Sequence, residues 1–114
     1  MGSMASLNIG LFGTKTRSDT LLVIHMLGET HASEIARVLE ISLSQAQKAI
    51  ESLERAGIVV GAEEGRARRV RVSPRLLIAD ELKALLAKLA QFDVPLQQRL
   101  AETRRRPRRS GKAI

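Results

Sequence analysis

Residues 31–57 read HASEIARVLEISLSQAQKAIESLERAG, and this stretch decides the fold. Apolar residues at helical spacing predict a helix over residues 32–39. Residues 40–42 then leave room only for a tight turn. Residues 42–45, Ser-Leu-Ser-Gln, fit the capping box. In this motif the N-cap hydroxyl accepts the backbone N–H of the third helical residue, and the side chain of that residue accepts the backbone N–H of the N-cap. A second helix over residues 42–56 therefore follows the turn.

The two helices have the side chains that a close crossing requires. Ala36 is the small residue at the crossing point, and apolar residues on both helices pack them together: Ile35, Leu39, Ile41, Ala46 and Ala49. The inward face of the second helix is expected to hold Leu43, Ala46, Ala49 or Ile50, and Leu53. Glu40 occupies the turn position where Gly is common, and a positive φ there costs about 1 kcal/mol. The pair is thus predicted to form a helix-turn-helix.

A helix precedes this unit and a β-hairpin follows it. Residues 17–27 predict a largely buried helix with Thr16 as its N-cap and Gly28 as its stop. Apolar residues alternate with arginine after residue 65, and residues 61–72 predict a hairpin that Pro74 ends. The fold class is therefore mainly α with a small β-hairpin wing, built on a three-helix core. We expect residues 17–75 to form this domain, with residues 4–16 packing on it and residues 1–3 resembling an expression scar.

A fourth helix over about residues 76–91, within a C-terminal segment 76–98, carries an apolar stripe. Its members recur at spacings of four, three, four and three: Ile78, Leu82, Leu85, Leu89 and Phe92. This stripe is expected to form a homodimer interface. The alternative is that it packs inside its own domain, or does both.

The positive charge is concentrated in two places. The chain has a net charge of +7, and residues 99–114 hold seven basic side chains against Glu102 alone. Five arginines also cluster around the hairpin: Arg66, Arg68, Arg69, Arg71 and Arg75. This pattern favours nucleic acid as a partner, with residues 99–114 as a basic disordered tail. A tail that only keeps the protein soluble is the alternative.

Several stretches together resemble the winged helix-turn-helix transcriptional regulators of the ArsR and MarR groups. The resemblance rests on residues 11–17, 31–36, 41–45, 53–59 and 65–66, and it spans roughly residues 11–92. It implies that the helix over 42–56 enters the major groove. It also implies that the wing over 61–72 contacts the backbone or minor groove, and that the protein acts as a dimer on double-stranded DNA. Our leading hypothesis is a sequence-specific regulator that acts as a repressor, with activation as the alternative.

The residue types suit that role. Glutamine can bond adenine bidentately, lysine can reach guanine or a phosphate, and serines near a helix N-terminus add donors for a phosphate. The resemblance places Ser44, Gln45, Gln47 and Lys48 at base-facing positions, and the wing arginines can follow the minor groove or bind phosphates. The candidate DNA-binding residues are Ser42, Ser44, Gln45, Gln47, Lys48, Arg66, Arg68, Arg69 and Arg71. Glu63 and Glu64 are expected to pair with Arg66 or Arg68 and hold the wing in shape.

Other functions find little support in the sequence. Cysteine is absent, and His25, Glu29 and His31 are the only local cluster that could be weighed as a metal site, so neither a metal nor a cofactor is expected. No nucleophile–base pair or phosphate loop indicates an enzyme. Phe12 and Phe92 are the only aromatics, which disfavours base-stacking platforms. No apolar run is long enough for a membrane span, and a cytoplasmic location is expected.

Two alternatives from other classes remain. A winged helix can act as a protein-interaction adaptor, for example beside a nucleotidyltransferase-type partner. An arginine-rich tail can also bind RNA. The sequence identifies no operator and no small-molecule effector.

Overall fold

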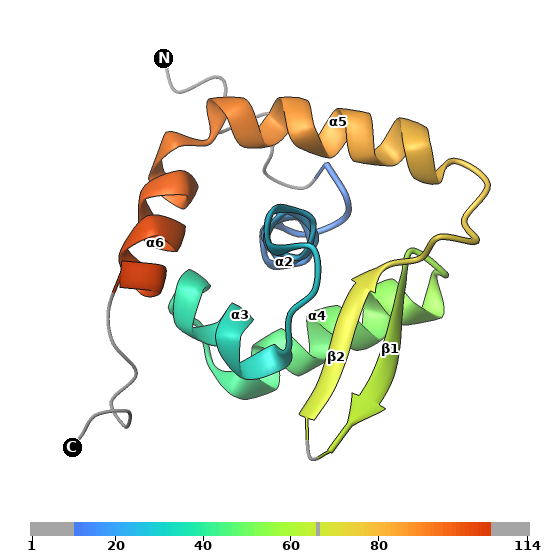
Figure 1. Cartoon of the computed structure of the whole chain (residues 1–114), viewed down its shortest axis with the longest axis horizontal. Coiled ribbons are helices and arrows are strands. Elements are labelled where there is room, and N and C mark those ends of the chain that lie inside the picture. Colours follow the sequence, from blue (N-terminus) through green and yellow to red (C-terminus); the bar gives the residue numbers. More distant parts are fainter. Residues whose placement is uncertain (1–10, 66, 106–114) are drawn as a thin grey trace.

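The computed structural model describes residues 11–65 and 67–105. Within these residues, five helices and one hairpin follow one another (Figure 1). They are α2 (Lys15–Leu27), α3 (Ala32–Leu39), α4 (Leu43–Arg55), β1 (Val59–Glu64), β2 (Ala67–Val72), α5 (Ala79–Phe92) and α6 (Val94–Arg105). The mainly α fold class with a small hairpin is confirmed.

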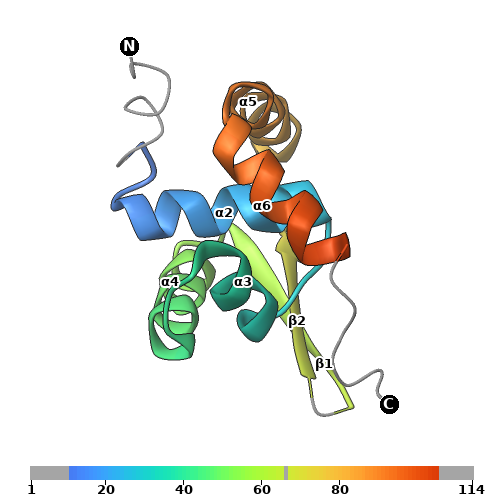
Figure 2. The same ribbon diagram turned by 90° about the vertical axis from the view of Figure 1, so that its left-hand side faces the viewer.

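Helix α2 is the centre of the molecule. Its residues 21–24, Leu-Leu-Val-Ile, are fully buried, and α2 runs between α5 on one side and the α3–α4 pair on the other (Figures 1 and 2). The helix begins two residues earlier than expected. Thr14, not Thr16, is the N-cap, and its hydroxyl accepts the Arg17 amide at 3.0 Å. The expected stop is confirmed, since Gly28 ends the helix with a φ of 82°.

The helix-turn-helix forms where the sequence predicts it. Ile35 and Leu39 of α3 are buried against α4, and Ala36 and Ile41 pack at the edge of the same core. Glu40 adopts the left-handed conformation, with φ 58° and ψ 46°, and its amide bonds the Ala36 carbonyl. One non-glycine residue in the turn thus lets α4 start in the required direction.

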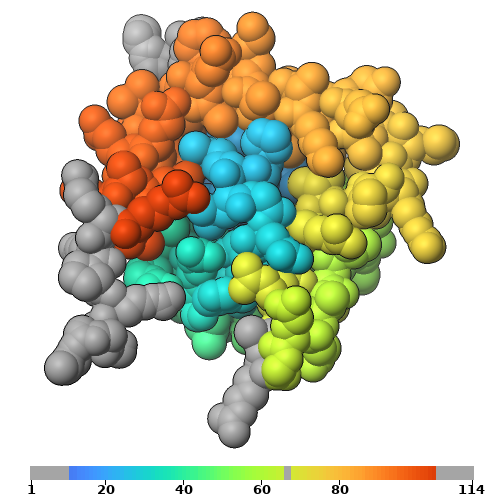
Figure 3. Space-filling model, viewed as in Figure 1, coloured from blue at the N-terminus to red at the C-terminus, as the bar shows by residue number. Residues whose placement is uncertain are grey.

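The wing is an antiparallel hairpin in which Gly61 faces Val70 and Glu63 faces Arg68. The free edge of β2 is partly covered by the loop between α2 and α3. There, Thr30 and Val70 exchange two backbone hydrogen bonds, of 3.0 and 2.7 Å. In the space-filling view the hairpin, yellow-green, projects from the lower edge of the body (Figure 3).

The C-terminal part differs from the sequence-based expectation. Helix α5 starts at Ala79, after a turn that follows Pro74, rather than at residue 76. Helix α6 then covers residues expected to be a disordered tail from position 99. The expectation was wrong for residues 99–105, because Leu96 and Leu100 lie one helical turn apart and both are buried in the core. Arg99 also donates to the Leu39 carbonyl at the end of α3, at 3.4 Å.

Residues 1–10 and 106–114 lie outside the described residues. The expectations for the first three residues, for positions 4–10 of the packing segment and for the end of the tail therefore concern a part of the chain that the structure does not describe. Phe12 is described, and it packs half-buried against the core.

Candidate nucleic-acid interface

Helix α4 presents its polar face to solvent. Ser44, Lys48, Glu51 and Arg55 recur at spacings of four, three and four, and all are exposed. Gln47 is exposed beside them. The opposite face, with Ala46, Ala49, Ile50 and Leu53, is buried. Arg55 and Glu51 were not among the residues expected to contact DNA, although their helical spacing from Ser44 and Lys48 was visible in the sequence.

The capping box fixes the start of α4, and it engages the side-chain oxygen of Gln45, one of the residues expected to contact bases. The Ser42 hydroxyl accepts the Gln45 amide at 3.0 Å, and Gln45 Oε1 accepts the Ser42 amide at 3.1 Å. The side-chain oxygen of Gln45 is therefore already bonded to the first turn of its own helix. Only its side-chain NH₂ group is left to bond a ligand, whereas Gln47 forms no such capping bond.

Leu43 does not lie where the sequence predicts. It was assigned to the inward face, but its exposed fraction is 48%. As the first residue of α4 it precedes Ala46, where the buried face begins. An exposed leucine thus stands at the leading end of the polar face, next to Ser44.

The hairpin divides its arginines between two faces. Because side chains alternate along a strand, Arg68 shares a face with Val70 and Val72, while Arg69 and Arg71 point the other way. Arg71 is exposed and forms no ion pair within the described residues. Arg69 Nε lies 3.5 Å from both Glu29 and Glu64 carboxylates. Arg66 lies outside the described residues.

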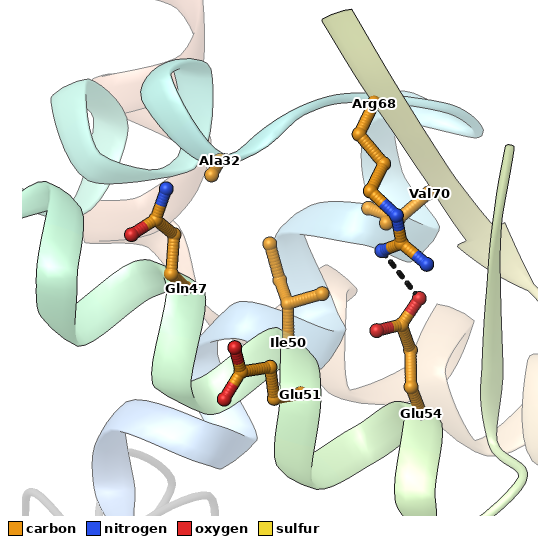
Figure 4. A pocket seen from close by; sticks show the side chains of 7 residues that line it. All are labelled: Ala32, Gln47, Ile50, Glu51, Glu54, Arg68 and Val70. Atoms are coloured by element: carbon orange, nitrogen blue, oxygen red, sulfur yellow. Dashed lines mark ion pairs between the residues drawn. The ribbon is translucent and has the colours of Figure 1, made fainter. Parts of the chain in front are cut away.

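Arg68 joins the wing to α4. Its Nη1 lies 2.6 Å from Glu54 Oε2 (Figure 4). The partner is therefore on α4, and it is neither Glu63 nor Glu64 of β1, which were expected to pair with Arg66 or Arg68. The cause is the strand alternation, which turns Arg68 towards the helix. Gly61 makes room for this pair, since a Cβ there would lie 2.6 Å from the Arg68 guanidinium and 2.7 Å from Glu54 Oε2.

A groove of about 490 Å³ lies between α4 and the wing. Gln47, Glu51 and Glu54 line it from α4, Arg68 and Val70 line it from β2, and Ala32 closes one end (Figure 4). Its two carboxylates face one arginine. We call it the wing groove.

The two histidines lie in different settings, His31 at the start of α3 and His25 half-buried on α2. His31 is the N-cap of α3, where its Nδ1 accepts the Glu34 amide at 3.3 Å and lies 2.9 Å from the Ser33 hydroxyl. Burial lowers the pKa of His25 from its ordinary value, and the positive charge of Lys83 lowers that pKa further. Over residues 11–65 and 67–105, no three acidic or histidine side chains gather as a metal site.

The apolar stripe of α5 is split between two environments. Leu82 and Leu89 are buried in the chain's own core, together with Leu86. Ile78, Leu85 and Phe92 remain 57%, 42% and 52% exposed, at intervals of seven residues. Leu82 and Leu89 therefore pack in the chain's own core, and the exposed part of the stripe consists of the other three.

Helices α3, α4 and α5 pack around α2. Because α3 and α4 cross after a tight turn and the hairpin follows α4, the fold is that of a winged helix-turn-helix protein. Comparison with solved structures confirms this fold. The chain is similar to the crystal structure of the adhesin competence repressor AdcR from Streptococcus pyogenes. The TM-score is 0.58 with 17% sequence identity, over 86% of this chain and 69% of AdcR.

The crystal structure of the transcriptional regulator SlyA is also similar. It has a TM-score of 0.56 and 16% identity, over 89% of this chain and 80% of SlyA. No protein-family model and no curated protein sequence matches the chain. No described helix has the length and apolar character needed to cross a membrane.

Proposed function

We propose that this chain is a sequence-specific, double-stranded DNA-binding transcriptional regulator that acts as a repressor in the cytoplasm. The observation that carries the proposal is the exposed polar face of α4 standing beside a basic hairpin. A helix of this width fits the major groove, where side chains reach base edges. The similar structures are themselves named a repressor and a transcriptional regulator.

The contacts divide by chemistry. Gln47 and Ser44 read base edges, with the amide of Gln45 in a lesser role because its oxygen caps the helix. Ser42, at the start of α4, and Lys48 contact phosphates of the DNA backbone. Arg71, Arg66 and the partly paired Arg69 contact backbone or minor groove from the wing. Arg68 acts differently from its sequence-based assignment, because it holds the wing against Glu54.

We further propose that two copies associate through the exposed stripe Ile78, Leu85 and Phe92 of α5. A dimer gains affinity by binding two half-sites on successive turns of the duplex. Helix α5 supports this arrangement because it lies across α2 from α4 (Figure 1), which leaves the polar face of each copy free.

Binding of a labelled random-sequence duplex over a salt series tests the proposal. The expected result is measurable affinity at low salt that falls linearly on a log–log plot, by about 0.9 per phosphate contacted. Structured RNA and unlabelled duplex serve as competitors. Absence of duplex binding at low salt would favour the adaptor, and stronger competition by RNA would favour binding through the basic C-terminal residues.

A further inference from the structure

A second groove lies on the flank of α4 that faces away from the wing. It is about 380 Å³ in volume and lies between α4 and the start of α2. Gln45, Lys48, Ala49 and Ser52 line it from α4, and Gly13, Thr14, Thr16 and Arg17 line it from the other side. We call it the α2 groove.

The two grooves occupy opposite flanks of α4. With 3.6 residues per turn, positions 45, 48, 49 and 52 are centred about 160° from positions 47, 50, 51 and 54. The exposed face with Ser44 and Lys48 lies between them. The polar face of α4 is thus bordered by the wing groove on one side and by the α2 groove on the other.

The charges of the two grooves differ. The wing groove has two carboxylates and one arginine, already paired with one of them. The α2 groove has two cations, Arg17 and Lys48, and no carboxylate among its lining residues. Neither cation forms an ion pair within the described residues. The α2 groove therefore has positive charge that the chain itself does not neutralise.

Arg17 is also short of a hydrogen-bond acceptor. Its Nε is buried and has no partner within the described residues. The side chain lies close to the backbone of Gly13, where a Cβ would be 3.1 Å from Nη1. A buried donor of a charged group without an acceptor is costly, so the guanidinium has hydrogen-bonding capacity that the described chain does not use. The planar guanidinium matches a phosphate because it can donate two parallel bonds.

We propose that the α2 groove binds one phosphate of the DNA backbone, with Arg17 as the forked donor and Lys48 as the second cation. This inference rests on the proposed function and adds a site to it. The major groove is about 12 Å wide and is walled by a backbone on each side, so a helix that fills it meets both walls. The wing contacts one wall, and the α2 groove contacts the other.

Two substitutions test the site by different routes. Arg17→Gln removes one positive charge and the fork. Thr16→Glu adds one negative charge to the groove, and it sits in the first turn of α2, where a carboxylate stabilises the helix. Thr16→Glu therefore repels a phosphate without weakening the fold. Lys83→Gln and Ala87→Glu are the matched controls, because they make the same charge changes at exposed positions of α5, across α2 from α4.

Affinity for a random-sequence duplex is measured over a salt series, with thermal unfolding of each variant recorded in parallel. Both test variants are expected to bind about tenfold more weakly. Arg17→Gln is also expected to make the log–log salt slope shallower by about 0.9, the value for one phosphate contact. The controls should stay within about twofold of the parent chain, because distant exposed charges are screened.

The outcomes separate the site from the function. A parent chain that binds no duplex removes the proposed function and the site with it. A parent chain that binds, with Arg17→Gln and Thr16→Glu no weaker than their controls, overturns the site alone. If Arg17→Gln unfolds, Thr16→Glu decides between these outcomes.

Discussion

At the scale of single residues, Glu40 sets the direction of α4 at a local cost. It is the one non-glycine residue with positive φ among those described, and the left-handed conformation disfavours any residue with a Cβ. Its value to the fold lies in the turn, not in its charge, since Glu40 is exposed and forms no ion pair within the described chain.

Replacing Glu40 by glycine is therefore expected to stabilise the protein. Glu40→Gly should raise the free energy of unfolding by up to about 0.6 kcal/mol, after the extra backbone freedom of glycine in the unfolded chain is subtracted. Chemical denaturation measures the change. Glu51→Gly, at an exposed helical position of α4, is the control and should lower stability by about 1 kcal/mol. A Glu40→Gly variant that loses as much as this control would contradict the turn assignment.

His25 makes stability depend on pH. Its pKa is lowered in the folded protein by burial and then by Lys83. Below an ordinary pKa of 6.5 the unfolded chain therefore binds a proton that the folded chain does not. Stability should rise with pH up to about 6.5 and level off above it. Urea unfolding across this range should show a shallower pH slope for His25→Gln than for the parent, and equal slopes would refute the effect.

Local sequence patterns identified most of these residues, but failed where two positions were equivalent by pattern. Thr14 and Thr16 can both cap a helix, and only the structure shows that Thr14 does so. Leu43 has the right spacing for an inward position, but the packing partners of α4 begin at Ala46. Arg17 could not be assigned from the sequence, because the groove around it combines α2 with α4.

At the scale of elements, the wing shares the core with α4 through Val59, Val70 and Val72, and the Arg68–Glu54 ion pair joins the two in a space that Gly61 leaves open. Arg66 and Arg68 look alike in the strand pattern, and the sequence analysis predicted that both contact DNA. The partner of Arg68 is 14 residues earlier, on another element, so only the packed structure could show it. The hairpin itself was predictable, since alternation and glycines mark it locally.

Gly61→Ala is expected to break this ion pair while leaving the hairpin formed. The three atoms nearest to the added Cβ belong to the flexible ends of Arg68 and Glu54, so the free energy of unfolding should fall by no more than about 1 kcal/mol. A double-mutant cycle of Glu54→Gln and Arg68→Gln measures the coupling. It should be about 0.2–1 kcal/mol in the parent and near zero in the Gly61→Ala background. Equal coupling in both backgrounds would show that Gly61 does not make room for the pair.

Only some features of the C-terminal helices α5 and α6 could be predicted from the sequence. The apolar stripe of α5 was visible, but its division into buried and exposed members depends on where α2 lies. Residues 99–105 of α6 were assigned to a disordered tail, because the arginines of that stretch outweigh Leu100 in composition. Two leucines one turn apart are enough to bury one side of it against the core.

At the scale of the whole molecule, the proposed dimer rests on the three exposed side chains of α5, Ile78, Leu85 and Phe92. Leu85→Glu should leave a folded monomer that binds DNA weakly, because Leu85 is at the centre of the exposed stripe and not in the core. Sedimentation at tens of micromolar measures the assembly state, and Ala87→Glu on the same helix is the control. A parent chain that sediments as a monomer would eliminate the dimer, and an unfolded Leu85→Glu variant would show that the stripe belongs to the core.

The central claim is that α4 reads base sequence in duplex DNA. Selection of duplexes from a random library, carried out with the parent chain and with Gln47→Ala, tests it most directly. The parent should enrich a defined sequence with half-sites about 10–10.5 base pairs apart. Gln47→Ala should lose about 1–3 kcal/mol on that sequence and much less on random DNA. Recovery of no enriched sequence by the parent, or of the same sequence with undiminished affinity by Gln47→Ala, would contradict the claim.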